Sequence, residues 1–317
     1  MSADPLSQIL ELLNARCLLS GGMVAGGAWA RHFLQPDAIK FMAVAEGECW
    51  LLMESLAAPL HLDTGDVIVV NGKRPLILAS DPAVQPMPAT EAYDHVIDGI
   101  GYLGDRREVF ILGGHVALDP ARQDLLLDVL PPLIHVRGSS GEAAVLHWLL
   151  QQLVRERSMA RPGAEVATAQ LAQLLFVQAL RAYLTTPEPI AAGGWLRALG
   201  DERIAPALQM MHADPARPWA LEELAKAVAM SRTTFALRFK TVVGVAPLAY
   251  LLGWRMHLAE RDLRESEVPV AALARTLGYS SESAFSNAFK RLKGVAPKRY
   301  RTDFRHAEPT GETGAVY

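Results

Sequence analysis

Cysteine and long apolar runs are scarce in this chain of 317 residues. Only two cysteines are present, whereas a secreted domain stapled by disulfides normally carries more, so a reducing cytoplasm is expected. No stretch approaches the roughly 20 uninterrupted apolar residues that span a bilayer. Residues 1–13 are polar and acidic before they become apolar, which is not the pattern of a secretory signal. The sequence therefore predicts a cytoplasmic protein without membrane contact.

Motifs of catalysis and of metal binding are also missing from the sequence. There is no Ser-His-Asp ordering, no Gly-rich phosphate loop, no CxxC pair and no His-x-His pair. Histidines scattered singly are more often ordinary surface or core residues than metal ligands. In the first 135 residues they are His32, His61, His95, His115 and His135. We therefore expect that the protein is not an enzyme and needs no cofactor and no metal.

Charge is distributed unevenly along the chain. The total is −3, but residues 201–305 carry 17 Lys and Arg against 11 Asp and Glu, while residues 1–200 carry 14 against 21. A basic block joined to an acidic one suggests that only the basic block meets a polyanion. Chance variation in surface charge is the alternative interpretation. The length is sufficient for two domains, each with its own core.

The last hundred residues contain an internal repeat of about fifty positions. The segment SRTTFALRFKTVVGVAP, which begins at Ser231, is matched by SESAFSNAFKRLKGVAP, which begins at Ser281. Upstream of each copy, apolar residues at i, i+3, i+4 and i+7 predict a short amphipathic helix. The two serines are good N-caps for a second helix, because a serine oxygen accepts from free backbone N–H groups. Each copy is therefore predicted to be a helix-turn-helix unit.

The second helix of each unit has an inner aromatic face and a free outer face. Its two phenylalanines lie at i and i+4, so the opposite face is left to enter the major groove of double-stranded DNA. The expected base contacts are Arg232, Thr233, Ala236, Leu237, Glu282, Ser283, Ser286 and Asn287. The expected phosphate contacts are Arg238, Lys240, Lys290, Arg291, Lys293 and Lys298. The alternative is a solvated surface of a small helical bundle.

A single helix is predicted between the two copies, from Pro247 to about Arg264. Proline is tolerated in a first helical turn, and eighteen residues span about 27 Å. Successive major grooves on one side of a duplex lie about 34 Å apart. One chain could therefore place its two units in adjacent half-sites.

Residues 1–135 show the patterns of short β-strands. Apolar runs at 41–44 and 49–53 are separated by a turn centred on Gly47. The run 67–70 precedes Asn71-Gly72, a strong hairpin signal. Many short strands with regular turns argue for a barrel or a sandwich.

The pattern becomes helical from residue 142 to about residue 184, with a break at Arg161-Pro162-Gly163. The apolar stripe of the second helix is broad, so that helix is expected to be buried by the barrel or by a second subunit. Residues 186–200 are the expected linker. Residues 306–317 are the expected flexible tail.

The C-terminal residues resemble the AraC/XylS family of bacterial regulators. The resemblance covers residues 201–305 and rests on LEELAKAVAMSRTTFALRFK, GVAPLAYLLGWRMHLA and VAALARTLGYSSESAFSNAFKRLKGVAPKRYR, the last being the family signature. In the N-terminal part, GECWLLME, LDTGDVIVV and LILASDP resemble the cupin-type sensory domain of one branch of that family. The sequence departs from relatives at Ala236 and Leu237, which suggests contact with thymine methyl groups. A second departure is at 71–74, where relatives often have a histidine.

The resemblance implies an α+β protein in three parts. A cupin-like β-barrel with a helical dimerisation region occupies residues 1–185, and an all-α DNA-binding domain with two helix-turn-helix units occupies residues 201–305. It also implies a sequence-specific transcription regulator. This regulator is expected to be an activator that forms a homodimer and acts together with RNA polymerase. The alternatives are a cupin enzyme fused to a DNA-binding module, which a bound transition metal would favour, and an architectural DNA binder without an effector.

An unknown small-molecule or oxidant effector is expected to act at the N-terminal domain. Some regulators with this domain arrangement respond to oxidants through cysteine, and Cys17 lies near the start of the domain where such a thiol could sit. Cys49 falls in a predicted strand, where a small buried apolar role explains it more simply. The residues considered for redox control are therefore Cys17 and Cys49, with ligand binding as the other possibility.

Overall fold

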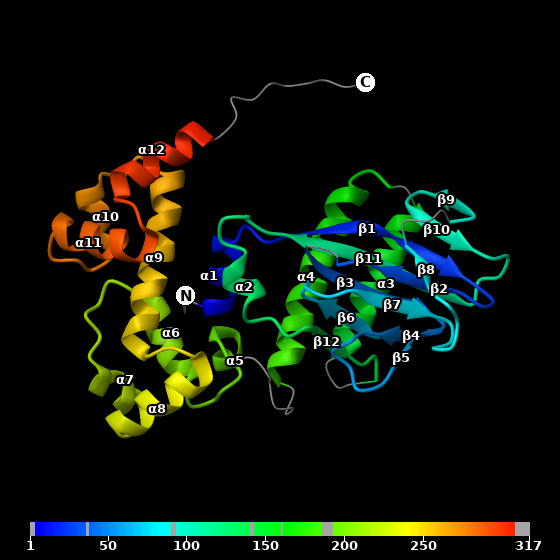
Figure 1. Cartoon of the computed structure of the whole chain (residues 1–317), viewed down its shortest axis with the longest axis horizontal. Helices are drawn as coiled ribbons and strands as arrows, with labels where there is room; N and C mark the ends of the chain where they lie inside the picture. Colours follow the sequence, from blue (N-terminus) through cyan, green and yellow to red (C-terminus); the bar gives the residue numbers. More distant parts are fainter. Residues whose placement is uncertain are drawn as a thin grey trace. The chain divides into compact units, whose positions relative to one another are not determined.

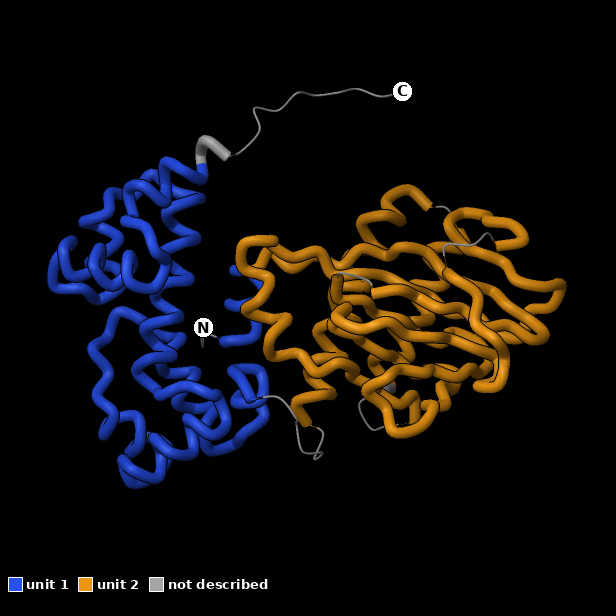
Figure 2. The backbone as a smooth tube through the Cα atoms, viewed as in Figure 1, with its two compact units in different colours: residues 1–12, 193–317 blue, residues 13–192 orange. Residues whose placement is uncertain are grey.

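The computed structural model describes residues 4–35, 38–89, 93–139, 143–159, 161–185 and 193–307. The chain divides into two compact units (Figure 2). The sheet unit is Leu13–Ala192, and the helical unit combines Met1–Leu12 with Gly193–Tyr317. Residues 186–192 of the expected linker and residues 308–317 of the expected tail lie outside the described residues. The rest of the expected linker, residues 193–200, belongs to the helical unit and includes a short helix at Trp195–Leu199.

The sheet unit contains two β-sheets that enclose one apolar core (Figure 1). The first sheet consists, in spatial order, of β12 (Leu133–Val136), β6 (Val67–Val70), β3 (Ile39–Glu46), β11 (Val109–Ala117), β1 (Arg16–Ala25), β10 (Ile100–Leu103) and β9 (His95–Ile97). The second consists of β5 (Leu60–Asp63), β4 (Glu48–Leu52), β7 (Leu76–Ala79), β2 (Ala30–Phe33) and β8 (Met87–Pro88). The core draws on both sheets, with Val44 and Ile111 from the first and Leu51 and Leu78 from the second.

The hairpin predicted at Asn71-Gly72 is wrong. Strand β6 pairs with β3 and β12 in the first sheet, whereas the next strand, β7, pairs with β2 and β4 in the second. The chain therefore crosses between the sheets at this turn. Gly72 has a φ of +74°, and a Cβ there would lie 2.2 Å from the carbonyl oxygen of Ala38. The dipeptide encodes the turn conformation, but it does not encode the partner of the strand that follows.

Two helices cover one face of the first sheet. They are α3 (Ala143–Met159) and α4 (Ala164–Thr185), and the expected break between them contains Gly163 with a φ of +82°. Helix α4 packs on β1, β6 and β12, and α3 packs on β3 and on α4 (Figure 1). The stripe predicted for α3 is buried, as expected from its spacing: Leu146, Leu149, Leu150 and Leu153. A short helix, α2 (Asp124–Leu127), precedes β12.

The helical unit contains two similar helix pairs on either end of one long helix. Its elements are α5 (Trp195–Leu199), α6 (Ala205–Ala213), α7 (Leu221–Ala227), α8 (Arg232–Val243), α9 (Pro247–Glu265), α10 (Val270–Thr276), α11 (Glu282–Lys293) and α12 (Pro297–Ala307). The long helix α9 confirms the helix predicted between the copies. It contributes Leu251 to the apolar cluster of the first pair and Met256 to that of the second.

The N-terminal helix α1 (Pro5–Leu12) belongs to the helical unit. The expected domain of residues 1–185 includes this segment, but α1 packs against α5, α6 and α9. Its apolar positions Leu6, Ile9 and Leu10 are buried. A short amphipathic helix needs an apolar partner, and nothing in its own sequence shows which distant segment supplies it.

Two helices of the helical unit also bear on membrane contact. Among the described residues no single helix has the length and apolar character to cross a bilayer. The pair α8 and α9, which is bent by 51°, has enough length and apolar composition to cross a bilayer only when the two helices are counted together. This result rests on length and composition alone.

Candidate functional site

The two helix pairs, α7–α8 and α10–α11, have the same local construction. Ser231 Oγ accepts a hydrogen bond from the Thr234 backbone N–H at 3.2 Å, and Ser281 Oγ accepts from the Ala284 N–H at 3.1 Å. Both predicted N-caps are therefore confirmed. Gly244 and Gly294 follow α8 and α11 in the left-handed conformation, which ends each helix.

The turns inside the two pairs are closed by equivalent backbone bonds. The Met230 N–H donates to the Ala225 carbonyl, and the Tyr279 N–H donates to the Ala274 carbonyl, both at 2.9 Å. Gly278 in the second turn has a φ of +79°, and a Cβ there would lie 1.9 Å from a backbone carbonyl oxygen. Glycine is thus required for the close approach as well as for the backbone conformation.

Aromatic side chains hold α8 and α11 in place from their inner faces. Phe235 and Phe239 are 0 % exposed with ring centroids 5.6 Å apart, and Phe285 and Phe289 are 0 % exposed with centroids 5.8 Å apart. These contacts confirm the inward direction predicted from the i, i+4 spacing. The outer faces of both helices are consequently left free of the core.

The residues expected to contact bases all lie on α8 or α11. Those exposed to solvent are Arg232, Thr233, Leu237, Ser283 and Asn287, and those half-buried are Ala236, Glu282 and Ser286. Leu237 is unusual because an apolar side chain is left 68 % exposed. Leu237 is therefore not a core residue of the helix pair, and its side chain is available for contact.

The cationic residues of this surface divide into paired and unpaired groups. Arg238 lies 2.8 Å from the carboxylate of Asp201, and Lys298 lies 3.4 Å from that of Glu282. Arg232 is likewise 3.0 Å from Glu222. Of the residues expected to contact phosphate, Lys240, Lys290 and Arg291 are exposed and form no ion pair with any described residue.

Lys293, expected to contact a phosphate, has a structural partner within the helical unit. Its Nζ lies 2.7 Å from Glu260, a buried carboxylate on α9 that also accepts a 3.2 Å hydrogen bond from the Tyr300 hydroxyl. Burial raises the pKa of Glu260, but its interactions with His257, at 3.4 Å, and with Lys293 outweigh burial and lower that pKa to about 2. No local sequence signal pairs a glutamate with a lysine thirty-three positions away.

Both cysteines are buried in the sheet unit. Cys17 lies on β1, where its backbone N–H donates to Gln173 Oε1 of α4 at 3.0 Å, and burial raises its thiol pKa to about 12. Cys49 lies in the core between the sheets, where burial and then the charges of Asp66 and Glu48 raise its thiol pKa to about 12. Only the thiolate is an effective nucleophile, so neither environment favours oxidation.

The histidines of the sheet unit have ordinary partners. His135 lies 2.7 Å from Asp66, and His115 Nδ1 lies 2.8 Å from Ser20 Oγ. His95 stacks on Tyr102. The remaining three are His147, whose Nε2 lies 2.8 Å from Gln151 Nε2 on α3, His61, on the β4–β5 hairpin, and His32, which lines the cavity described below.

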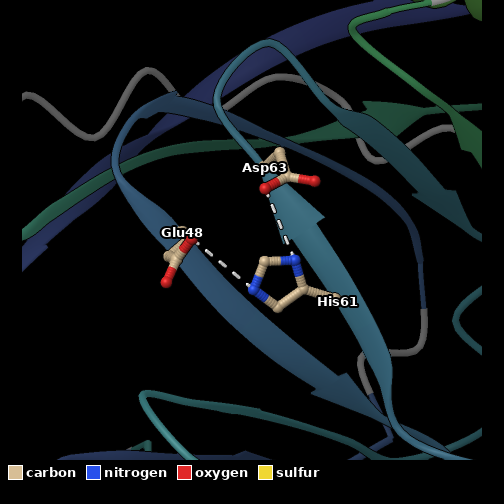
Figure 3. Close-up of side chains that lie close together, drawn as sticks. All are labelled: Glu48, His61 and Asp63. Atoms are coloured by element: carbon tan, nitrogen blue, oxygen red, sulfur yellow. Dashed lines mark ion pairs between the residues drawn. The ribbon is translucent and has the colours of Figure 1, made fainter.

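One group of potential metal ligands lies on the β4–β5 hairpin (Figure 3). His61 meets Glu48 at 3.7 Å through one ring nitrogen and Asp63 at 3.4 Å through the other. The two carboxylate side chains are 72 % and 69 % exposed. Leu51 and Leu62 of the same strands face the core, so the trio lies on the outer face of the sheet. The arrangement is that of a surface ion-pair cluster, outside the barrel interior.

A cavity of about 500 Å³ opens between the two sheets. Its walls are mostly apolar, with Met42 and Ile111 from the first sheet and Leu76 and Leu78 from the second. Few polar side chains line it, and these are Ser20, His32, Lys40 and Tyr93. A concave, largely apolar site of this size fits a small organic molecule. No sequence pattern indicates this cavity, because its walls come from strands that are distant in the chain.

Comparison with known families covers both units. The Cupin family matches residues 4–185, and the Helix-turn-helix domain family matches residues 224–303. A putative AraC-like transcription regulator of Streptomyces lividans is 41% identical over 94% of this chain and 98% of its own length. The RCS-specific HTH-type transcriptional activator RclR of Escherichia coli is 27% identical over 96% of this chain and 100% of its own length.

Comparison with solved structures gives a partial match. The DNA-binding domain of AdpA, solved in complex with a target DNA, is 34% identical and covers 35% of this chain and 96% of that domain, with a TM-score of 0.31.

Proposed function

The chain belongs to the family of AraC-like transcription regulators, and we propose that it reads DNA with two helix-turn-helix units, α7–α8 and α10–α11. The observation that carries the proposal is the repeated design of α8 and α11. Each is capped by serine, held by two buried phenylalanines and free on its outer face. The 19-residue helix α9 joins them, so one chain would read two adjacent half-sites.

The proposed readout differs between the two units. Asn287 on α11 is exposed and suits a bidentate contact with adenine, whereas Leu237 on α8 suits van der Waals contact with a thymine methyl group. We assign phosphate contacts first to the unpaired cations Lys240, Lys290 and Arg291. Lys293 is left out of that set, since its ammonium group is already matched by the buried Glu260.

Control is proposed to act through the sheet unit. The large apolar cavity supports a small-molecule effector, and the burial of Cys17 and Cys49 weighs against an oxidant.

We propose a homodimer formed through α3 and α4, because these helices leave large apolar side chains in solvent. Activation with RNA polymerase is proposed from the family membership. An enzymatic role for the cupin-like domain has less support, since the trio of Figure 3 lies on the outer face.

Fluorescence anisotropy with DNA flanking the protein's own gene tests the proposal. Specific fragments are expected to bind about 10³-fold or more tightly than random DNA. Asn287→Ala is expected to cost about 1–3 kcal/mol on the specific fragment and little on random DNA, because one base contact is lost. On a transcription template with RNA polymerase, the same fragment is expected to give more transcript when the protein is added.

The matched control is Ser280→Ala, which alters an exposed residue of the turn before α11 and should leave both affinities unchanged. Equal, steeply salt-dependent binding to every fragment would reduce the protein to a phosphate binder. Absence of binding at low salt to any fragment would refute the proposal.

A further inference from the structure

We propose that the cavity of the sheet unit binds an apolar carboxylate, with its aliphatic or aryl body between the sheets and its carboxylate against Lys40. The inference rests on the proposed function, since this molecule would be the effector of the regulator. It is carried by three features of the cavity: apolar walls, space created by a glycine, and one cation without a partner.

The walls of the cavity select an apolar body. Phe33, Met42, Leu76, Leu78 and Ile111 line it from both sheets. A sugar or a nucleotide would leave most of its polar groups without partners there, which costs free energy for every unpaired group. Burial of a hydrocarbon chain or an aromatic ring against these side chains is favourable in proportion to its area.

A glycine on β11 leaves room for that body. Gly113 alternates with Ile111 and His115 along the strand, so all three positions face the same side. A Cβ at Gly113 would meet only Met42 Cγ, at 3.8 Å, and the Phe41 carbonyl oxygen, at 4.0 Å. The position therefore tolerates a side chain without steric strain, and the cavity exists partly because none is present. Glycine within a strand often marks a site where a ligand comes close.

Lys40 determines the charge expected at the polar end of the ligand. It is two residues from Met42 on β3, hence on the same face of the strand, and it lines the cavity. Among the described residues it has no ion pair and no hydrogen-bonded carboxylate. A half-buried ammonium group beside an apolar space is best matched by one anionic oxygen group.

The neighbours of Lys40 also favour an anion over a cation. His115 is paired with Lys40 across β11 and β3, and its Nδ1 lies 2.8 Å from Ser20 Oγ. Burial and then the charge of Lys40 lower the pKa of His115 below 6.5, so the imidazole is mostly neutral near pH 7. Among the described lining residues, Lys40 is thus the only lysine or arginine, and its neighbour across the strands is a neutral imidazole.

Isothermal titration calorimetry of the full-length protein, without DNA, tests the inference with three matched eight-carbon probes. Octanoate, 1-octanol and octylamine share one apolar body and differ only in the charge of the head group. Octanoate is expected to bind at least about 10-fold more tightly than 1-octanol, and octylamine more weakly than either.

Three variants locate the site. Lys40→Met should reduce octanoate to the affinity of 1-octanol while leaving 1-octanol unchanged. Gly113→Leu should weaken binding of both, because its side chain projects into the space that the apolar body would occupy. Lys73→Met is the matched control, since Lys73 is an exposed cation of the same unit already paired with Asp128 at 3.1 Å, and both affinities should persist.

The outcomes separate this inference from the proposed function. Equal affinity of the parent for octanoate and 1-octanol, survival of the preference in Lys40→Met, or no binding of either probe would overturn it. Circular dichroism checks that Gly113→Leu is folded, and if it is not, the Lys40→Met comparison decides alone. If the protein binds its operator but does not bind octanoate, the proposed function stands and only the ligand class is refuted.

Discussion

At the scale of single residues, Glu260 shows how one buried charge holds the second helix pair to α9. Its side chain is 8 % exposed and is matched by Lys293, the Tyr300 hydroxyl and His257. A buried carboxylate is tolerated only when such partners replace water. The same pairing explains why Lys293, although it lies on α11, is not free to contact a phosphate.

Glu260→Gln is expected to destabilise the helical unit at neutral pH by about 3 kcal/mol, because it leaves the ammonium group of Lys293 without its partner. The folded pKa of about 2 lies below the ordinary value of 4.5. The carboxylate therefore contributes stability that is present above about pH 4.5 and is lost as the pH falls toward 2. Urea unfolding at pH 7, 5 and 3 should show parent and variant converging at the lowest pH.

Glu222→Gln provides the control for that measurement, since its carboxylate is 67 % exposed in its pair with Arg232. Exposed pairs contribute about 0–1 kcal/mol. A constant difference between parent and Glu260→Gln at all three pH values would contradict the assignment of the lowered pKa to this residue.

At the scale of elements, the outer sides of α3 and α4 carry the proposed dimer contact. Val145 and Trp148, at i and i+3 on α3, are 46 % and 53 % exposed, and Val166 on α4 is 68 % exposed. Trp148→Glu places a charge on this face and is expected to convert a dimer into a monomer in sedimentation velocity, because burying an unpaired charge is costly. Leu248→Glu, equally apolar and 46 % exposed on α9, should leave the dimer intact. A monomeric parent protein would refute the contact.

The elements also show how far the sequence alone could predict the fold and the site. The N-caps Ser231 and Ser281, the inward phenylalanines and the break at Gly163 rest on interactions within a few residues, and the structure confirms them. Strand pairing depends on contacts between distant segments, so the turn at Gly72 was correctly located but its hairpin was wrong.

The remaining parts of the site depend on three-dimensional proximity. The cavity combines Lys40 and Gly113 with residues of the second sheet, and no spacing in the sequence relates these positions. The surface trio of Figure 3 is likewise formed by two strands that pair only in the folded chain. The individual roles of the base-contacting and phosphate-contacting residues stay predictions, which the anisotropy measurements address.

At the scale of the whole molecule, the helical unit is assembled from two separate parts of the chain. Helix α1 supplies its first part, and Leu13–Ala192 then forms the sheet unit before the chain returns at Gly193. His212 on α6 ties the parts together, since its Nδ1–H donates to Gln8 Oε1 at 2.9 Å and its Nε2 accepts from the Tyr250 hydroxyl at 2.8 Å. Burial lowers the pKa of His212 to about 4, which keeps it neutral for this bridge.

The connection from α1 into the sheet unit is short. Only residues 13–15 separate α1 from β1, and β1 contributes Ser20 and Met23 to the wall of the cavity. A ligand-induced change in β1 would therefore reach α1 through three residues of backbone. A change transmitted to α1 would affect α9 only if the packing of α1 stabilises the helical unit.

Ile9→Ala in the full-length protein tests that contribution. Ile9 is 1 % exposed, and removal of a buried isoleucine side chain costs about 2–5 kcal/mol. Amide hydrogen exchange followed by mass spectrometry should accelerate in peptides of α6 and α9, because α1 packs on these helices, and stay unchanged in β4 and β7. Glu11→Ala, on the exposed side of α1, should change neither set. Acceleration confined to the sheet unit would instead show that α1 stabilises that unit, and would remove the route from the cavity to α9.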